Sequence, residues 1–488
     1  MKIKFLLLIC ILSSCTMTPK YHRPKLNMPD EYRLSLNENK ELTCEPLIRA
    51  ANIEWWEELN DLVLNRLITD ALANNNDLKF AIARVDEYYG IVGVVSSLLY
   101  PQVDGEFYKA RQQYSLNAVP NPITGSPSLQ RFNTYSTLFN AAYEIDIWGK
   151  IQSRSDAAYT DYLRQIEVRR TVVLTLVAEV ANAYIELRRL DKQMKISIKT
   201  LKSREEAERI ARARFEEGLT SELPLKQAQS ETEAAIIAIK VLEIQIPQQE
   251  NLISVLIGQP PGAIARGETL DTLTMPEKIP VGVPAQLITQ RPDILAAEDI
   301  LIATNFDIGA ARAAFLPTIS LSGFYGNQST HAFNLMSGNS VTWSTFINIF
   351  QPIFTGGRLI SELAIAKARN QEALFNYYNI VLNALKEVND ALIAHKKNLE
   401  LVVEQKAQVE IFQKYRYLAE LQYNNGESDY LNVLDAERRL FESQLLLATR
   451  EANSFTSLVN LYKALGGGWV IDADNFNSMV SQDEPCQS

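Results

Sequence analysis

The amino-acid sequence contains one unit twice, and this duplication limits the possible fold more than any other feature. Gly218 in the first half matches Gly426 in the second half, 208 residues later. Further upstream the separation is 216 residues, as between Pro101 and Pro317, so the first copy holds eight more residues between Pro101 and Gly149. Two copies of this length predict a pseudo-symmetric fold, in contrast to a solenoid of many short repeats.

Each copy has the same predicted order of elements. A helical segment is followed by two strands, a very long helix and a shorter helix that runs back. The first copy spans residues 57–258 and the second spans 292–466. The predicted bounds in the two copies are about 57–97 and 292–314 for the first helical segment, about 100–148 and 317–356 for the strands, 150–216 and 358–424 for the long helix, and 220–257 and 428–465 for the return helix.

The predicted strands alternate between apolar and polar residues. Within 134–148 the odd positions include Tyr135 and Phe139, whereas the even positions include Ser136 and Asn140. Such alternation gives a strand one apolar and one polar face. Each run also reaches the roughly 9–11 residues that cross a bilayer as a tilted strand. A soluble hairpin domain at the end of a coiled coil remains the alternative interpretation.

The two long helices show the apolar spacing of coiled coils. At 1.5 Å per residue each helix is expected to be roughly 100 Å long. Apolar residues at steps of three and four predict a buried seam on each helix. In the first helix this seam consists of Val173, Val177, Val180, Tyr184 and Leu187, continued by Met194, Ile198 and Leu201. In the second helix it consists of Leu382, Leu385, Leu392, Leu399 and Val403. Gly218 and Gly426 then end the helices, as glycine usually does.

The first fifteen residues have the pattern of a bacterial lipoprotein signal. A short apolar core at 5–12 follows two lysines and is too short to span a bilayer. It ends in Leu-Ser-Ser-Cys, which resembles a lipobox, so we predict that residues 1–14 are removed and that Cys15 is lipidated. Thr16 follows in place of the aspartate that retains lipoproteins at the inner membrane, which favours the outer membrane. A plain secretion signal with a chance cysteine is the alternative.

Few other residues suggest chemistry. An exported compartment permits a disulfide between Cys44 and Cys486, although their spacing alone gives no support for one. The three histidines are scattered and no cysteine pair has ligand spacing, so neither a metal site nor another cofactor is predicted. The run of three glycines at 466–468 lacks the lysine of a phosphate-binding loop, and no catalytic constellation is present, so we do not expect an enzyme. The net charge of −10 argues against nucleic acid as a partner.

The number of strands predicts the assembly. An open four-stranded sheet cannot persist in a membrane, because its edges would leave unpaired amides in hydrocarbon. Three chains would supply twelve strands, an even number within the range of outer-membrane barrels. The predicted fold class is therefore mainly α with membrane β. Three copies would form a homotrimer with a 12-stranded β-barrel and a long α-helical coiled-coil tunnel in the periplasm.

Several short motifs, in a fixed order, now carry a resemblance that covers nearly the whole mature chain. They are the lipobox, Trp55-Trp56, Leu59-Asn60-Asp61-Leu62, Asp146-Ile147-Trp148-Gly149, Arg291-Pro292-Asp293 and Phe354-Thr355-Gly356-Gly357-Arg358. Together with the duplication they resemble the outer-membrane efflux protein family (TolC-like), in particular its OprM/NodT-type lipoprotein branch. The resemblance implies an equatorial domain built from 15–56, 259–291 and 467–488. It also implies a periplasmic membrane-fusion adaptor and an inner-membrane pump, of the resistance-nodulation-division type, as partners, with outer-membrane lipid around the barrel.

The same resemblance implies a gate at the two helix-turn-helix tips. Tyr423 would help to constrict the closed channel and Asp435 would contribute to an acidic ring at the aperture. Asn432 occupies a position where the family has an aspartate, which puts a second ring in doubt. The adaptor is expected to bind at the tips, which comprise Gly218, Leu219, Thr220, Gly426, Glu427 and Ser428. Simpler interpretations remain open: a solvated helix charge for Asp435, coiled-coil packing for Tyr423, tight turns for the glycines and a helix start for Arg291-Pro292-Asp293.

The predicted function is the outer-membrane exit channel of a tripartite efflux system. Such a channel would passively conduct small molecules (drugs, toxic compounds or metal ions) to the exterior, gated at the periplasmic helix tips. A channel for type I protein secretion is an alternative within the same architecture. A non-conducting structural lipoprotein is an alternative of another class. In such systems the inner-membrane pump generally selects the cargo.

Overall fold

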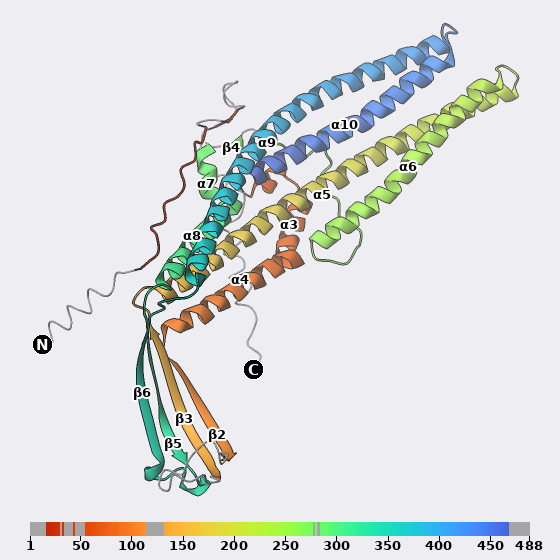
Figure 1. The fold of residues 1–488 in the computed structure, drawn as a ribbon. Helices are drawn as coiled ribbons and strands as arrows, with labels where there is room; N and C mark the ends of the chain where they lie inside the picture. Colours follow the sequence, from red (N-terminus) through yellow and green to blue (C-terminus); the bar gives the residue numbers. More distant parts are fainter. Residues whose placement is uncertain are drawn as a thin grey trace. The chain divides into compact units, whose positions relative to one another are not determined.

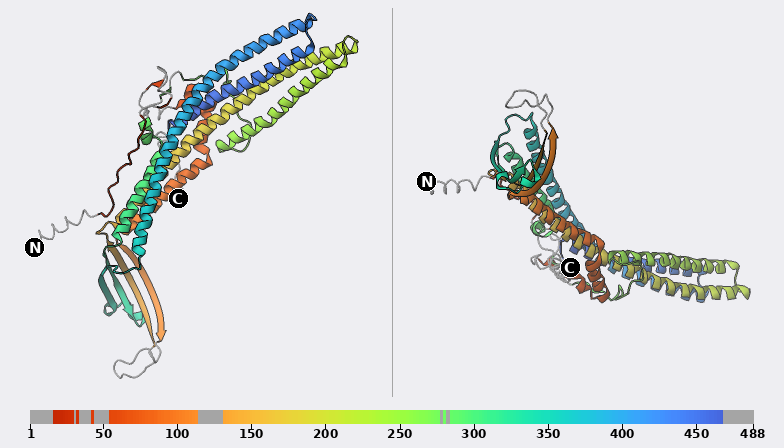
Figure 2. Two further views of the ribbon diagram at one scale, coloured as in Figure 1. Left: turned by 45° about the horizontal axis from the view of Figure 1, so that its top comes forward. Right: turned by 90° about the horizontal axis from the view of Figure 1, so that it is seen from below.

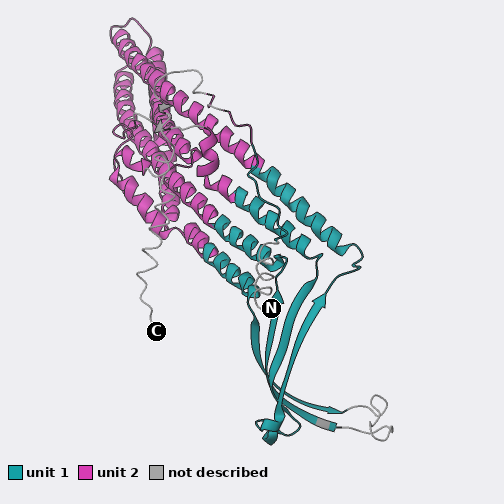
Figure 3. Ribbon diagram, turned by 90° about the vertical axis from the view of Figure 1, so that its left-hand side faces the viewer, with its two compact units in different colours: residues 1–25, 85–165, 297–377 teal, residues 26–84, 166–296, 378–488 magenta. Residues whose placement is uncertain are grey.

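The computed structural model describes residues 16–29, 32–33, 42–43, 54–113, 131–276, 279–280 and 284–467. The chain divides into two compact units, which Figure 3 shows in two colours. The first unit contains the β-sheet and consists of residues 1–25, 85–165 and 297–377. The second unit consists of 26–84, 166–296 and 378–488. Each unit therefore contains segments of both repeats.

The first unit contains a four-stranded antiparallel sheet, to which each repeat contributes one hairpin (Figure 1). The strands are β2 (Gln102–Gln113), β3 (Arg131–Ile145), β5 (Thr318–Ser329) and β6 (Val341–Phe350). Their order is β2-β3-β5-β6, so the two repeats join where β3 pairs with β5. Figure 2 shows the four strands curving together as one sheet.

All odd-numbered residues of this sheet lie on one face. In each of its three strand pairings odd residues face odd residues, as in Phe139 opposite Tyr325 and Tyr325 opposite Trp343. This face carries exposed apolar side chains on all four strands, namely Val103, Phe107, Phe139, Ile145, Leu321, Tyr325, Val341, Trp343, Ile347 and Ile349. The even face carries more polar residues, such as Ser136 and Asn140, and exposes fewer large apolar side chains, namely Tyr108, Phe346 and Phe350. A sheet of a soluble protein packs its apolar face onto a core, whereas here that face points outward.

The N-terminal segment 16–25 is bound to helices of the first unit. The Thr18 hydroxyl lies 2.9 Å from that of Ser153, and the guanidinium of Arg23 binds both carboxylate oxygens of Glu298 at 2.7 and 2.6 Å. A Cβ at Gly309 would lie 2.1 Å from the Thr18 hydroxyl oxygen, so only glycine allows this close approach. The helical parts of this unit are the end of α4 (Asn76–Ser96), the start of α5 (Lys150–Glu216), most of α8 (Pro292–Ala313) and the start of α9 (Arg358–Asn424). Short 3-10 turns lie at Ser97–Leu99, Ala332–Asn334 and Gly338–Ser340.

Each repeat has one very long helix and one shorter helix that follows it. The long helices are α5 (Lys150–Glu216) and α9 (Arg358–Asn424), and the return helices are α6 (Glu222–Leu256) and α10 (Tyr430–Ala464). Both long helices have 67 residues and both return helices have 35. The bounds of the long helices coincide with those expected from the sequence. Among the described residues, none of the helices combines the length and the apolar character that crossing a membrane would require.

The buried face of each long helix differs in part from the predicted seam. In α5 the residues from Val173 to Leu187 that were expected to be buried are buried, but Ile198 is exposed and Ser197 and Arg204 are buried in its place. In α9 Leu382, Leu399 and Val403 are exposed. The buried positions there are Val381, Ala384, Val388 and Leu392. The predicted seam of α9 is therefore wrong at Leu382, Leu399 and Val403 and right at Leu392, because the buried face is turned toward Val381, Ala384 and Val388.

The first helical segment, predicted over about 57–97, consists of several helical pieces. These are a 3-10 turn (Trp55–Leu59), α3 (Leu62–Asn74) and α4. Asn75 has an extended ψ of 131°, and its side-chain oxygen accepts a hydrogen bond from the amide of Leu78 at 3.0 Å. An asparagine that caps a new helix start stops the preceding helix. The remaining short elements are η4 (Pro284–Gln286), α7 (Leu287–Gln290) and the paired strands β1 (Leu42–Thr43) and β4 (Ile279–Pro280).

Candidate gate at the helix tips

The two tips have the same backbone geometry. Gly218 and Gly426 adopt left-handed φ values of 72° and 75°. The amide of Leu219 donates to the carbonyl of Arg214 at 2.8 Å, and the amide of Glu427 donates to that of Gln422 at 2.9 Å. This bond, which spans six residues around a left-handed glycine, is the usual closure of a helix C-terminus. The turns are therefore dictated locally by the two glycines.

A side-chain contact joins the two tips within the second unit. Arg214, near the end of α5, donates a hydrogen bond from Nη1 to the hydroxyl of Tyr423, near the end of α9, at 2.8 Å. The same guanidinium lies 5.4 Å from the centroid of the Tyr423 ring. A cation within about 6 Å of an aromatic centroid is attracted to the ring. Arg214 thus binds both the hydroxyl and the ring of Tyr423, and we call this contact the tip link.

Tyr423 also belongs to a small apolar cluster. Ala419, Val433 and Ala436 form its buried centre, against which Tyr415, Tyr423 and Tyr430 pack. The rings of Tyr423 and Tyr430 are 5.2 Å apart. Burial raises the pKa of Tyr430 to about 12, so its hydroxyl keeps its proton at physiological pH. The packing interpretation of Tyr423 and its contact with Arg214 therefore both hold, since the ring packs while the hydroxyl accepts.

Asp435 is half-buried and paired with cations of its own helix. It accepts a hydrogen bond from Arg439 Nε at 2.7 Å, and Arg438 Nη2 lies at 3.4 Å. The hydroxyl of Tyr415 donates to it at 3.3 Å. The hydrogen bond from Arg439, aided by the nearby Arg438, holds the pKa of Asp435 below its usual range. Asp435 is therefore ionised, but its charge is compensated locally.

The other predicted tip residues are mostly exposed. Leu219 has 75% of its surface exposed. Glu427, which occupies the matching position of the second tip, is also exposed. Asn432 donates from Nδ2 to the hydroxyl of Ser428 at 2.7 Å, which holds the start of α10. A pocket of about 230 Å³ is lined by residues of both tips. Its polar lining residues are Arg214, Thr220, Glu420, Tyr423, Asn424, Tyr430 and Glu437.

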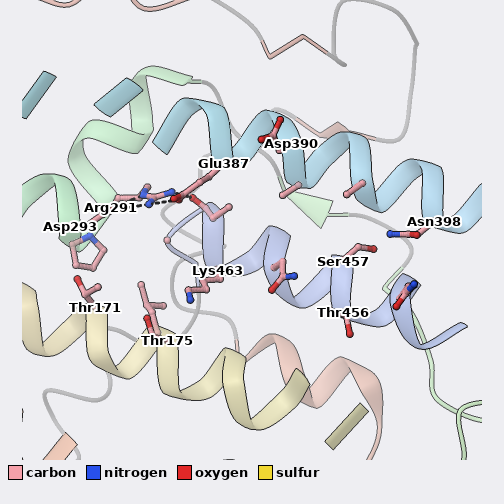
Figure 4. A pocket seen from close by; sticks show the side chains of 18 residues that line it. Thr171, Thr175, Arg291, Asp293, Glu387, Asp390, Asn398, Thr456, Ser457 and Lys463 are labelled. Carbon is pink, nitrogen blue, oxygen red and sulfur yellow. Dashed lines mark hydrogen bonds and ion pairs between the residues drawn. The ribbon is translucent and has the colours of Figure 1, made fainter. Parts of the chain in front are cut away.

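The motif Arg291-Pro292-Asp293 does more than start a helix. Arg291 binds both carboxylate oxygens of Asp293 at 3.0 and 2.6 Å, Glu387 of α9 at 2.8 Å and the carbonyl of Ala464 in α10 at 2.8 Å. Burial by itself would lower the pKa of Arg291, but the two carboxylates outweigh it and raise the pKa. Arg291, Asp293 and Glu387 line a pocket of about 540 Å³, to which hydroxyl and amide side chains such as Asn398 also contribute (Figure 4). The motif therefore joins the start of α8 to the later helices.

Sequence reasoning missed Arg214, and the repeat shows only that its partner hydroxyl is particular to the second copy. The repeat aligns Tyr423 with Phe215, so the hydroxyl that Arg214 binds is present in the second copy alone. The predicted lipidation site Cys15 and the predicted pair Cys44 and Cys486 lie outside the described residues. They therefore stay predictions.

Known proteins resemble the chain over almost its whole length. The family model described as outer membrane efflux protein matches residues 67–259 and 283–467. The antibiotic efflux pump outer membrane protein ArpC of Pseudomonas putida is 33% identical over 477 residues, which are 97% of each protein. The cation efflux system protein CusC of Escherichia coli K12 is 32% identical over 471 residues, 94% of this chain and 97% of CusC. The solved CmeC outer membrane channel of Campylobacter jejuni is 25% identical and matches with a TM-score of 0.85 over 96% of this chain and 98% of its own.

These matches confirm the resemblance, the fold class and the outer-membrane location that the sequence predicts. They also agree with the expectation that the protein is a transporter and no enzyme. The chain therefore belongs to the outer membrane efflux protein family and is an outer-membrane efflux channel.

Proposed function

We propose that this channel is the lipid-anchored, trimeric exit duct of a tripartite efflux system, closed at its helix tips until a periplasmic adaptor opens it. Its cargo would be small molecules, because relatives of near-equal length are named for antibiotic efflux and for cation efflux. The channel itself would conduct passively. The observation that carries the proposal is the tip link between Arg214 and Tyr423.

Trimer formation is supported by the edges of the sheet. β2 and β6 are its outer strands, and neither has a second strand partner among the described residues. Unpaired backbone groups of this kind cannot remain in hydrocarbon. Pairing β2 of one copy with β6 of the next, three times over, would close a barrel of twelve strands. Helices of the same unit also expose large apolar side chains that neighbouring copies could cover, namely Tyr89 and Val94 on α4 and Ile360 and Phe375 on α9.

Lipid anchoring at Cys15 is supported by the position of its neighbour in sequence. Thr16 lies against Gly149, where a Cβ would be 3.3 Å from the Thr16 methyl group. Gly149 stands between the end of β3 and the start of α5. The described chain thus begins beside the sheet–helix junction of its own unit. A lipid attached one residue earlier would be near the membrane that this sheet spans.

The tip link supports a gate, because it joins the two repeats of one chain near their ends. Breaking it would free the α9–α10 tip from the α5–α6 tip. A hydrogen bond to a charged group contributes about 1.5–3 kcal/mol. A contact of that strength, made in the closed state alone, shifts an open–closed equilibrium by about tenfold or more. An adaptor that binds at Gly218–Thr220 and Gly426–Ser428 would act beside this contact and connect the channel to a pump of the resistance-nodulation-division type.

The proposal is tested by single-channel conductance of the purified trimer in planar bilayers. Tyr423→Phe and Arg214→Met each remove the hydrogen bond of the tip link. We expect the wild type to give small, infrequent steps, and both variants to raise the open fraction by about tenfold. Arg212→Met is the matched control, because Arg212 lies on the same helix and pairs with Glu208 of that helix.

The outcomes separate the parts of the proposal. If both link variants conduct like the Arg212 control, the gate does not depend on the tip link. If no form conducts although trimers are inserted, the channel activity itself is contradicted. A separate measurement distinguishes small-molecule efflux from protein secretion. Cells that carry the channel with its adaptor and pump should export a small antibiotic or cation.

A further inference from the structure

The turn between β5 and β6 presents two apolar side chains to the outside. Phe333 is fully exposed at 103% and Met336 is exposed at 76%. The turn is nevertheless compact, since Leu335 is buried and two short 3-10 turns flank it. Exposed apolar side chains in an ordered turn indicate a surface that is covered by a binding partner or by lipid.

Met336 of the turn contacts a residue on the apolar face of the sheet. Asn327 is an odd-numbered residue of β5, so its side chain projects from the same face as Tyr325. Its Nδ2 donates to the sulfur of Met336 at 3.7 Å, which places Met336 on that face as well. Asn327 is paired with Val341 of β6, an exposed apolar residue. The apolar surface of the sheet therefore continues into the turn.

Two hydroxyls of the turn bind its own backbone. The hydroxyls of Ser337 and Ser340 both donate to the carbonyl of Asn334, at 2.7 and 2.5 Å, and lie 3.1 Å apart. From Thr330 to Ser340 the sequence contains no Asp, Glu, Lys or Arg. A segment in contact with hydrocarbon must satisfy its polar groups internally and carry no charge. The turn carries no such charge, and the hydroxyls of Ser337 and Ser340 are satisfied within it.

We propose that the β5–β6 turn is a membrane anchor, in which Phe333 and Met336 enter the apolar layer of the outer-membrane lipid. The occupant of this surface is lipid acyl chain, because the turn continues the face that the sheet presents to the membrane. Aromatic residues at the ends of membrane strands commonly lie at the level of the lipid headgroups. Three copies would place such an anchor around the barrel at this end of the strands.

The test uses a photoreactive amino acid in the full-length lipidated protein in outer membranes. p-Benzoylphenylalanine is introduced at position 333 or 336, and trimers are isolated after irradiation. We expect adducts of lipid mass at both positions, with a yield within about twofold of that at position 343, an exposed residue of the apolar face. Position 328, on the even face of β5, is the matched control and should give at least fivefold less lipid adduct.

Two results would overturn the proposal. A covalent link between chains from position 333 or 336 would show that the turn meets a second copy, as in a constriction at the pore axis. Lipid adduct no greater than at position 328 would show that the turn faces water. Because only assembled trimers are analysed, a variant that fails to fold is removed from the comparison, and the other position still decides the result.

Discussion

The two tips of the chain share the same backbone geometry but carry different side chains. Both long helices have 67 residues, both return helices have 35, and both turns close around a glycine with φ near 70–75°. The side chains differ at the matching positions. Tyr423 corresponds to Phe215, and Asp435 corresponds to Gln227. The duplication therefore preserved the turn, whose geometry depends on one glycine, while the groups around the turn diverged.

This comparison shows where specificity could arise in a duplicated fold. The first tip supplies Arg214, and the second supplies the tyrosine that Arg214 binds. Neither repeat could form the tip link with a copy of itself, because the first has phenylalanine at the tyrosine position and the second has Gln422 at the arginine position. The link is thus a contact between unlike halves.

The largest loss of stability is expected from substitution of a left-handed glycine that packs against another backbone segment. Gly258 ends α6 with the same left-handed φ, and a Cβ there would lie 2.4 Å from the carbonyl oxygen of Asn74. Gly218 and Gly426 have open space around that position. We expect Gly258→Ala to destabilise the fold by roughly 3 kcal/mol or more, from strain plus overlap. Gly218→Ala and Gly426→Ala should each cost about 1–2 kcal/mol.

Thermal loss of helical circular dichroism in detergent would rank these three variants. Gly218→Ala and Gly426→Ala serve as controls for each other, since they change the same turn in the two repeats. Equal midpoints for all three variants would contradict the role given to the Asn74 contact. Unequal midpoints for the two tip variants would contradict the equivalence of the tips.

The next effect tests the difference between the tips by exchange. The double variant Phe215→Tyr with Tyr423→Phe keeps the composition and moves the hydroxyl to the first tip. Because Arg214 binds the hydroxyl at position 423, we expect the exchanged channel to open as often as Tyr423→Phe alone, about tenfold above wild type. Phe215→Tyr alone should leave single-channel conductance unchanged. Recovery of the closed state in the double variant would mean that either tip can hold the link.

The sequence predicted the parts of this fold that depend on local rules. The glycines just past their C-termini located the ends of α5 and α9, and the alternation of apolar and polar residues identified the two faces of β3. The same rules failed where packing decides. Leu382 fits a helical seam by spacing, yet Val381 and Ala384 are buried in its place, since the contact face is chosen by the neighbouring helix. Spacing along one helix carries no information about that choice.

The candidate site was predictable to a similar extent. Tyr423 and Asp435 were expected at the gate from family resemblance, and the structure brings Tyr423 to Arg214. The partner itself was not predicted, because it lies 209 residues away and in the other repeat. The cations that neutralise Asp435 stand three and four positions along the same helix, a spacing at which side chains meet. That pairing could have been read from the sequence.

A smaller effect is expected at His395, which corresponds to the fully buried Leu187 of the first repeat. Burial lowers the pKa of His395, so the folded state holds it neutral. The unfolded state then binds more protons below the ordinary imidazole pKa of about 6.5, and stability falls as pH drops from that value. We expect His395→Leu to remove part of the acid sensitivity between pH 7 and pH 5, for which proton linkage sets an upper limit of about 2 kcal/mol.

Thermal midpoints of wild type and His395→Leu at pH 7, 6 and 5 provide the measurement. The hydroxyl of Ser457, which lies 3.3 Å from His395 Nδ1, also donates to the carbonyl of Ser454 at 2.7 Å, so the substitution leaves it bonded. His22→Leu, at an exposed position of the N-terminal segment, is the control for histidine replacement in general. Parallel pH dependence in wild type and His395→Leu would show that the imidazole is not the responsible group.

The smallest expected effect is a change in ion selectivity, and it tests the charge difference between the two tips. Arg439, whose counterpart in the first repeat is Glu231, donates to Asp435 at 2.7 Å and is the main cause of its lowered pKa. In Arg439→Gln the pKa of Asp435 should rise toward its usual range, which still leaves the carboxylate ionised at pH 7. If Asp435 faces the aperture, three less compensated carboxylates should increase the preference for cations. Exposed ion pairs contribute up to about 1 kcal/mol, so the permeability ratio should change by no more than about fivefold.

The reversal potential in a potassium chloride gradient measures this preference. The shift should be present at pH 7 and should fade near pH 4, where Asp435 begins to bind a proton once its cation partner is removed. Arg209→Gln is the matched control, because Arg209 pairs with Glu206 three residues earlier on an exposed face of α5. An unchanged reversal potential in Arg439→Gln would remove Asp435 from the conduction path. The charge at this position would then be an ordinary feature of a solvated helix, and the tip link would remain as the difference between the two tips that bears on gating.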